Sequence, residues 1–119
     1  MVAYIDGFII PVLPGRKDDY RALCDKAAEV FLDHGATRVV ETWGDDMPEG
    51  KVTDFQKAVQ IEEGEGIVFS WIWWPSKEAR DAGNGRMMSD PRMKMPDDMP
   101  FDGKRMIFGG FEIAYDSGE

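Results

Sequence analysis

The sequence predicts a single α+β domain, residues 1–119, of the split βαβ or ferredoxin-like type, with both helices on one face of a four-stranded antiparallel sheet. Three observations lead to this prediction. The length of 119 residues is usual for one domain. Segments with the periodicity of strands and of helices follow one another in the order β-α-β-β-α-β. Glycine or proline separates most of these segments, as expected where a chain turns.

An apolar stripe marks the helix in the first half of the chain. Tyr20, Leu23, Ala27 and Val30 recur at helical spacing, and Gly35 follows as a stop signal. The segment before this helix is rich in β-branched and aromatic residues, which favours a strand. The elements expected here are a strand at 2–12, a helix at 16–34, a strand at 36–44, a loop at 45–54 and a short helical turn at 55–61.

The second half of the chain opens with an aromatic strand that ends at Pro75. Ser76 is a suitable N-cap for the next helix, although Ala79 stands where a complete capping box has Glu or Gln. Three prolines break up the segment after that helix. The elements expected here are a strand at 67–74, a helix at 77–88, an irregular segment at 89–103, a strand at 104–115 and a polar tail at 116–119.

The charge balance excludes two classes of partner. Lys and Arg number 14 against 23 Asp and Glu, which gives a formal net charge of −9. Because that charge repels phosphate backbones and anionic lipid headgroups, we expect neither a nucleic-acid nor a membrane partner. Cys24 is the only cysteine, so no disulfide can form within the chain, which fits a reducing compartment. The N-terminus lacks the basic segment of a signal peptide, and the longest apolar stretch, 67–74, is too short to span a bilayer. We therefore expect an acidic cytoplasmic protein.

Alternation along the strands sorts the side chains into two sets, one for each face of the sheet. The first set, which we assign to the core under the helices, is almost wholly apolar: Ala3, Ile5, Gly7, Ile9, Val40, Thr42, Ile67, Phe69, Trp71, Trp73, Ile107, Gly109, Phe111 and Ile113. The second set comprises Tyr4, Asp6, Phe8, Ile10, Val39, Glu41, Trp43, Val68, Ser70, Ile72, Trp74, Met106, Phe108, Gly110 and Glu112. It is too apolar to face water, yet it carries polar groups that a dry core would exclude.

This second set predicts a surface that is both an interface and the wall of a ligand cavity. Two copies that meet sheet to sheet about a two-fold axis would make a homodimer with the cavity between the sheets. The aromatic side chains suit a small planar organic ligand, although large aromatics are also common core and interface anchors. Of the tryptophans, Trp43 and Trp74 are assigned to the cavity and Trp71 and Trp73 to the core. The candidate ligand-binding residues are Tyr4, Phe8, Trp43, Ser70, Trp74 and Phe108.

Three carboxylates on the same set, Asp6, Glu41 and Glu112, are candidate catalytic residues. Carboxylates that share a poorly solvated pocket push each other's pKa values apart, which provides an acid and a base. The alternative is that each sits at a strand end or pairs with an arginine. His34, the only histidine, ends the first helix, where the helix dipole favours an imidazolium. Because one histidine does not make a zinc or haem site, we expect no metal and no cofactor.

Five methionines gather in and beside the irregular segment: Met87, Met88, Met93, Met95 and Met99. Methionine adapts to irregular surfaces, so this region could be a lid or a partner-binding arm. The alternative is a loop that its own methionines pin over the barrel or the dimer seam. Cys24 lies on the apolar stripe of the first helix, and we expect it to be a small buried hydrophobic residue.

Several motifs resemble the YbaA-like family of uncharacterised bacterial proteins. They are YIDGF at 4–8 with Pro11, IVFSWI at 67–72 running into WPSK at 74–77, DPRM at 90–93, and MPFDGKRMIFGGF at 99–111. The resemblance covers nearly the whole chain and implies a dimeric α+β barrel, in which two ferredoxin-like protomers pack their sheets together. The wider superfamily includes cofactor-independent monooxygenases, lactone isomerases, haem-dependent enzymes and members without known activity. The resemblance therefore transfers no catalytic residue to this chain.

The sequence leaves three functions open. The first is a small-molecule-binding homodimer of unknown biological role, favoured because no nucleophile–base pair or metal cluster is visible. The second is a cofactor-independent enzyme of the monooxygenase or isomerase type, with Asp6, Glu41 or Glu112 transferring a proton. The third is a protein-interaction module that uses the methionine-rich loop.

Overall fold

The fold is the predicted split βαβ arrangement. The structure, a computed structural model, describes residues 2–118. Its elements in chain order are β1 (Tyr4–Val12), α1 (Lys17–Asp33), β2 (Arg38–Trp43), α2 (Phe55–Ala58), β3 (Gly66–Trp74), α3 (Lys77–Met88), the 3-10 turn η1 (Pro91–Met93) and β4 (Ile107–Glu112). The predicted ferredoxin-like fold is therefore confirmed, with most boundaries within two or three residues of those expected.

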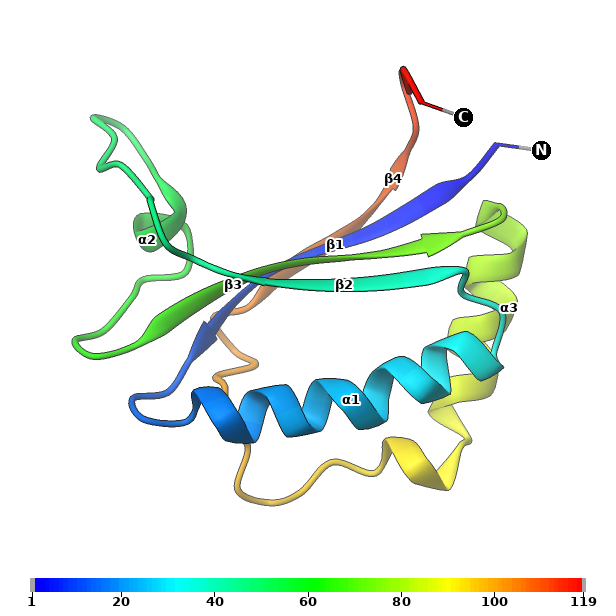
Figure 1. The fold of residues 1–119 in the computed structure, drawn as a ribbon, viewed down its shortest axis with the longest axis horizontal. Coiled ribbons are helices and arrows are strands. Elements are labelled where there is room, and N and C mark those ends of the chain that lie inside the picture. The colour runs from blue at the N-terminus through cyan, green and yellow to red at the C-terminus, as the bar shows by residue number, and fades with distance from the viewer. Residues whose placement is uncertain (1, 119) are drawn as a thin grey trace.

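The sheet has the strand order β2-β3-β1-β4, and every neighbouring pair is antiparallel. The long central pair, β1 with β3, sets Tyr4 opposite Trp74 and Phe8 opposite Ser70. Helices α1 and α3 cover one face, whereas the short helix α2 lies on the opposite side of the sheet (Figure 1). We call these the helix-covered face and the open face. Among residues 2–118, no helix is long and apolar enough to cross a membrane.

The assignment of side chains to the two faces was inverted. Tyr4, Ile10, Ile72 and Trp74, all from the second set, are buried under the helices. The first set lies on the open face, where Phe111 is 59% exposed. The prediction failed because both sets are apolar: alternation shows which residues share a face, but not which face receives the helices. Two carboxylates of the second set, Asp6 and Glu41, are compatible with this face because the fold supplies them with hydrogen-bond partners, whereas Glu112 is exposed.

Close packing beneath α3 accounts for one glycine of that helix. The core cluster at this end of the sheet contains Tyr4, Val30, Ala36, Ile72, Trp74 and Met87. A Cβ atom at Gly83 would lie 2.5 Å from Cζ3 of Trp74, so only glycine lets the helix approach the indole ring this closely. Ser76 begins the same helix as predicted, because its Oγ accepts a hydrogen bond from the Ala79 amide at 3.1 Å. Trp74 is thus a core residue, and Trp71 and Trp73, which were expected in the core, lie on the open face.

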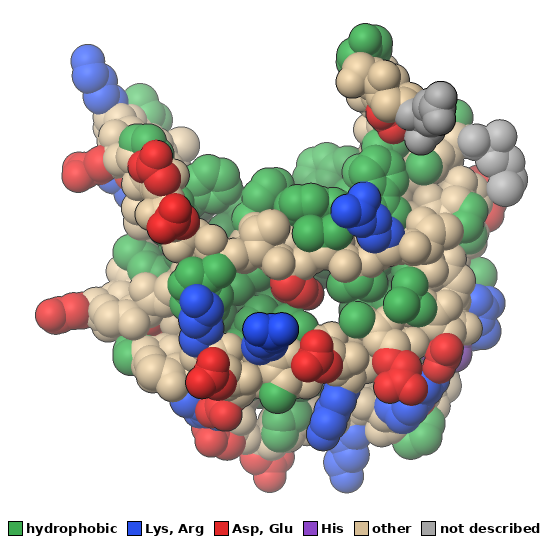
Figure 2. All heavy atoms as spheres, in the orientation of Figure 1, with side chains coloured by type: hydrophobic (Ala, Val, Ile, Leu, Met, Phe, Trp, Pro, Cys, Tyr) green, Lys and Arg blue, Asp and Glu red, His purple; other side chains and the backbone are tan. Residues whose placement is uncertain are grey.

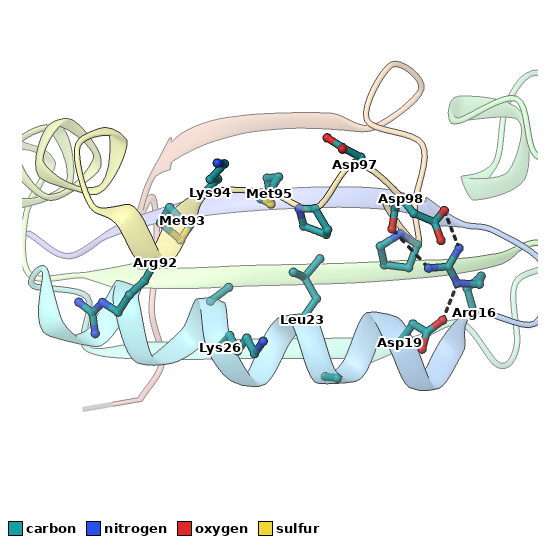
Figure 3. A pocket seen from close by; sticks show the side chains of 14 residues that line it. Arg16, Asp19, Leu23, Lys26, Arg92, Met93, Lys94, Met95, Asp97 and Asp98 are labelled. Carbon is teal, nitrogen blue, oxygen red and sulfur yellow. Dashed lines mark hydrogen bonds and ion pairs between the residues drawn. The ribbon is translucent and has the colours of Figure 1, made fainter.

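The irregular segment 89–100, which we call the strap, runs back along α1 (Figure 3). At one end, His34 Nε2 lies 2.8 Å from Asp90 Oδ2, and Arg92 Nη1 donates to Asp33 Oδ2 at 2.7 Å. At the other end, the Leu13 amide donates to the Pro100 carbonyl oxygen at 2.9 Å. Both ends of the strap are therefore tied to residues that flank or end α1.

Candidate functional site

A cavity of about 170 Å³, which we call the chamber, lies between α1, the strap and the helix-covered face. Its walls are mostly aliphatic, aromatic and methionine side chains. The lining residues are Phe8, Ile10, Tyr20, Leu23, Cys24, Ala27, Phe31, Glu41, Ser70, Ile72, Met93, Met95, Phe101 and Met106. Apolar walls with few polar groups are typical of small-molecule sites. In Figure 2, a hollow is visible between the helix layer and the sheet.

The strand register builds the floor of this cavity. Phe108, Phe8, Ser70 and Glu41 are directly paired neighbours across β4, β1, β3 and β2. Paired residues of antiparallel strands point to the same face, so these four side chains form one row under the helices. Three of them, Phe8, Ser70 and Glu41, line the chamber. The row places a single carboxylate at its β2 end.

Tyr20 meets that carboxylate from the opposite wall. It lies in the first half of α1, on the apolar stripe that faces the sheet, and its side chain is buried. Its hydroxyl donates a hydrogen bond to Glu41 Oε1 at 2.9 Å. Glu41 belongs to an edge strand and is exposed as a whole residue, but this bond holds its carboxylate against the chamber wall. The pair joins α1 to the sheet.

Burial governs the protonation of this group. Burial raises the pKa of Glu41, although the hydrogen bond from Tyr20 acts in the opposite direction. Burial and the adjacent Glu41 carboxylate raise the pKa of Tyr20, and burial raises the pKa of Cys24 to about 12. At neutral pH, Tyr20 and Cys24 therefore keep their protons, and Glu41 is a proton acceptor of increased basicity.

The three predicted carboxylates do not converge. Asp6 is 5% exposed and accepts hydrogen bonds from Trp74 Nε1 and Arg80 Nε, both at 3.0 Å. It lines a separate cavity of about 640 Å³ between α3, the strap and β4, which we call the vestibule. Glu112 lines a third cavity of about 380 Å³ near the N-terminus. Of the three, only Glu41 lines the chamber.

The predicted ligand-binding residues are divided in the same way. Phe8 and Ser70 line the chamber, and Phe108 lines the vestibule, where its ring stacks on Phe8 at a centroid distance of 6.2 Å. Tyr4 and Trp74 lie in the core. Trp43 is outside the lining of the chamber, and the Lys17 ammonium lies 4.8 Å from its ring centroid. Because these residues face the helices, the structure contradicts a cavity formed by them between two sheets.

Sequence reasoning missed the residues that α1 and the strap contribute to the chamber. Tyr20 was treated as a core position of the helix stripe, and Cys24 as a buried apolar residue. The signal that could have identified them is the presence of two polar side chains on an otherwise apolar stripe. Met93 and Met95 reach the site only because the strap folds back over α1, which no local pattern encodes.

The remaining polar clusters have structural partners. His34 pairs with Asp90 at the anchored end of the strap, and neither residue lines the chamber. Within residues 2–118, no group of three or more His, Cys, Asp or Glu side chains has the arrangement of a metal site. Of the clustered methionines, Met87 is buried and Met93 is half-buried, whereas Met88 and Met95 are exposed.

Comparisons with known proteins agree with the fold. The sequence pattern of the family described as "Protein of unknown function (DUF1428)" matches residues 3–103. The uncharacterized protein YbaA of Escherichia coli K12 is 59% identical over 114 residues, covering 95% of this chain and 97% of that protein. The YbaA of Shigella flexneri matches to the same extent. A crystal structure from Bacillus cereus, named as a candidate antibiotic biosynthesis monooxygenase, superimposes with a TM-score of 0.60 at 12% identity over the whole of both chains.

Proposed function

The chain belongs to the DUF1428 family of proteins of unknown function, and we propose that it is a small-molecule-binding protein that acts as a homodimer and holds its ligand in the chamber. The observation that carries this proposal is the Glu41–Tyr20 pair, the acidic and phenolic groups of a mostly apolar cavity. A purely structural core gains little from a carboxylate whose pKa is raised by burial. A ligand that donates a hydrogen bond to Glu41 would offset that cost.

The size of the chamber restricts the ligand. An apolar cavity of about 150 Å³ in another protein holds one benzene ring. The chamber, at about 170 Å³, therefore suits a compact planar molecule with a single ring. A hydroxyl on that ring would meet the Glu41 carboxylate, and the ring itself would contact Phe8, Phe31 and the methionines. Flavins and haem exceed this volume.

Thermal shift with a panel of single-ring phenols, quinones and lactones tests the proposal. We expect at least one compound to raise the melting temperature of the wild type. The shift should decrease in Glu41→Gln and in Tyr20→Phe, since each removes one polar partner in the chamber. Glu112→Gln, which changes a carboxylate outside the chamber, is the matched control and should keep the shift. If no compound stabilises the wild type, or if Glu112→Gln abolishes the shift as fully as Glu41→Gln, the chamber is not the binding site.

The open face supports the homodimer. Phe69, Ile107 and Phe111 are large apolar side chains that this face leaves exposed. A contiguous apolar surface of this kind marks an interface, and a second copy of the same face can cover it about a two-fold axis. The α2 region and the segment after β4 rise on this side of the sheet and border the surface (Figure 1).

Light scattering tests the dimer with two matched substitutions, each of which replaces an exposed apolar side chain by glutamate. Phe111→Glu places a charge on the open face at a side chain that is already exposed in the single chain, so the protomer should still fold. We expect a wild-type dimer and a Phe111→Glu monomer. Leu32→Glu, a comparable change at an exposed side chain of α1 on the other side of the sheet, should stay dimeric. A monomeric wild type would remove the homodimer from the proposal.

The Glu41–Tyr20 geometry also favours a second candidate, a cofactor-independent enzyme. A carboxylate of raised pKa is a stronger base, and Tyr20 at 2.9 Å can orient it. Glu41 could take a proton from a carbon acid and return it to another carbon, which is an isomerisation. With dioxygen as co-substrate, the same deprotonation could begin a monooxygenation, the activity for which the Bacillus cereus neighbour is named. Turnover that is lost in Glu41→Gln and retained in Glu112→Gln, with both variants folded, would establish this candidate.

A further inference from the structure

Three cavities meet at one side chain of the strap. The chamber shares lining residues with the vestibule of about 640 Å³ and with a groove of about 630 Å³ between α1 and the strap, which we call the outer groove (Figure 3). Phe8, Phe31 and Met93 lie at the boundary between the chamber and the vestibule, because these residues line both. Leu23, Ala27, Met93 and Met95 line both the chamber and the outer groove. Met93 is common to all three cavities.

We propose that Met93 is the gate and the size filter of the chamber: its side chain closes the passage to the vestibule and the outer groove, and it limits the wild-type ligand to a single-ring compound. This proposal deepens the proposed function, because it names the residue that sets ligand size. When the Met93 side chain swings aside, the chamber joins the two larger cavities. With that side chain truncated, the joined space would hold fused rings or an extended chain.

The other shared residues are less suited to move. Phe8 belongs to the central strand β1 and stacks on Phe108, and Phe31 belongs to α1 and packs edge-on against Trp74 at a centroid distance of 6.2 Å. Met93 instead ends the 3-10 turn η1 and continues into a stretch without regular structure. Methionine is unbranched and has three rotatable side-chain bonds, so it can change shape without a shift of its backbone.

The anchors of the strap indicate a side-chain gate and not a hinged backbone lid. Close to Met93, the Asp90 carboxylate accepts a hydrogen bond from the Arg92 amide at 2.9 Å and contacts His34 at 2.8 Å. Arg92 is also paired with Asp33 of α1 at 2.7 Å. These ties hold the backbone at residues 90–92 against the end of α1. Motion at position 93 is therefore expected mainly in the methionine side chain.

Cys24 provides a native reporter of the gate. It is the only cysteine of the chain, it is half-buried and it lines the chamber, so its reaction with a thiol reagent reports access to the chamber. Two reagents of different size are compared at one pH on the full, folded chain: iodoacetamide, which is small, and N-(1-pyrenyl)maleimide, which carries four fused rings. The quantity measured is the ratio of their second-order rate constants. Comparison at one pH keeps the fraction of thiolate the same for both reagents.

We expect the wild type to react with iodoacetamide and to resist the pyrenyl reagent. Met93→Ala should raise the rate for the pyrenyl reagent by at least about tenfold and change the iodoacetamide rate much less, because truncation of a partition admits the larger molecule. Met88→Ala is the matched control: this methionine is 89% exposed, lines the vestibule and not the chamber, and should leave the ratio unchanged. Met93→Leu, similar in volume but branched, should stay close to the wild type.

Two results would overturn the gate. One is an unchanged rate ratio in Met93→Ala. The other is an equal acceleration of both reagents, which would indicate that Cys24 reacts through general opening of the fold. The proposed function fails separately: a changed ratio without any stabilising compound retains the gate and rejects the ligand. A bound single-ring compound with an unchanged ratio in Met93→Ala retains the ligand and rejects the gate.

Discussion

The ion pair between Asp6 and Arg80 permits a quantitative test of how the fold tolerates a charge in its core. Asp6 accepts hydrogen bonds from Trp74 Nε1 and Arg80 Nε, and Arg80 Nη2 lies 2.9 Å from the same carboxylate. The hydrogen bond to Asp6 raises the pKa of Arg80. Removal of either partner takes a counterion from the other, so each single substitution should cost stability.

The structure makes the two losses unequal. Removal of one member of a fully buried pair costs about 3–5 kcal/mol. The Arg80 side chain is 23% exposed and also pairs with Asp81, so water and Asp81 offset part of the loss of Asp6. Asp6→Asn keeps an acceptor for the indole of Trp74, and we expect a loss of about 2 kcal/mol. Arg80→Met leaves a carboxylate buried with one neutral donor, and we expect a loss of about 3 kcal/mol.

A double-mutant cycle in urea, followed by tryptophan fluorescence, measures the coupling. The double variant Asp6→Asn/Arg80→Met leaves no charge of the pair behind, so its loss should be at least about 1 kcal/mol smaller than the sum of the single losses. Asp98→Asn, which weakens the exposed pair of Asp98 with Arg16, is the control and should change stability by less than about 0.5 kcal/mol. Single losses that add to within about 0.5 kcal/mol would refute the reasoning, because the two side chains would then be independent.

Two further predictions concern α3 and the chamber. Gly83→Ala should destabilise the protein, because its Cβ would lie 2.5 Å from Cζ3 of Trp74 and 2.6 Å from the His34 carbonyl oxygen. In the same helix, a Cβ at Gly85 meets no atom within 4 Å, so Gly85→Ala should raise the free energy of unfolding by roughly 0.5–1 kcal/mol. Urea midpoints that move in the same direction for both variants would contradict the close approach of α3. Burial raises the pKa of Glu41 in the folded protein. The stability that this group contributes is therefore fully present below the pKa of an unfolded glutamate, about 4.3. It is lost as the pH rises through the pKa of Glu41 in the folded protein. Glutamine does not titrate, so Glu41→Gln does not lose stability in this way. The urea midpoint of the variant minus that of the wild type should therefore rise from acidic to neutral pH. A difference in midpoint that is constant with pH would argue against a raised pKa of Glu41.

Local signals in the sequence were sufficient for the elements and their order. The helix expected at 77–88 is α3 with the same bounds, because a serine cap and a proline mark its start and its end. The strand expected at 104–115 is longer than β4, since apolar and aromatic residues continue beyond the part of the strand that pairs with β1. Alternation also identified the row that contains Phe8, Ser70 and Glu41 as one face of the sheet.

Tertiary structure alone decided where that face points and what lies above it. Both faces are apolar, so their composition did not show which one the helices cover; that choice depends on the handedness of the βαβ crossover in three dimensions. Tyr20 and Glu41 are 21 residues apart and share no periodicity, yet packing of α1 on the sheet brings their oxygens to 2.9 Å. Met93 lines the chamber because ion pairs at the end of α1 hold the strap in place. The sequence thus determined the elements and the members of each face, whereas the long-range packing of α1 and the strap created the site.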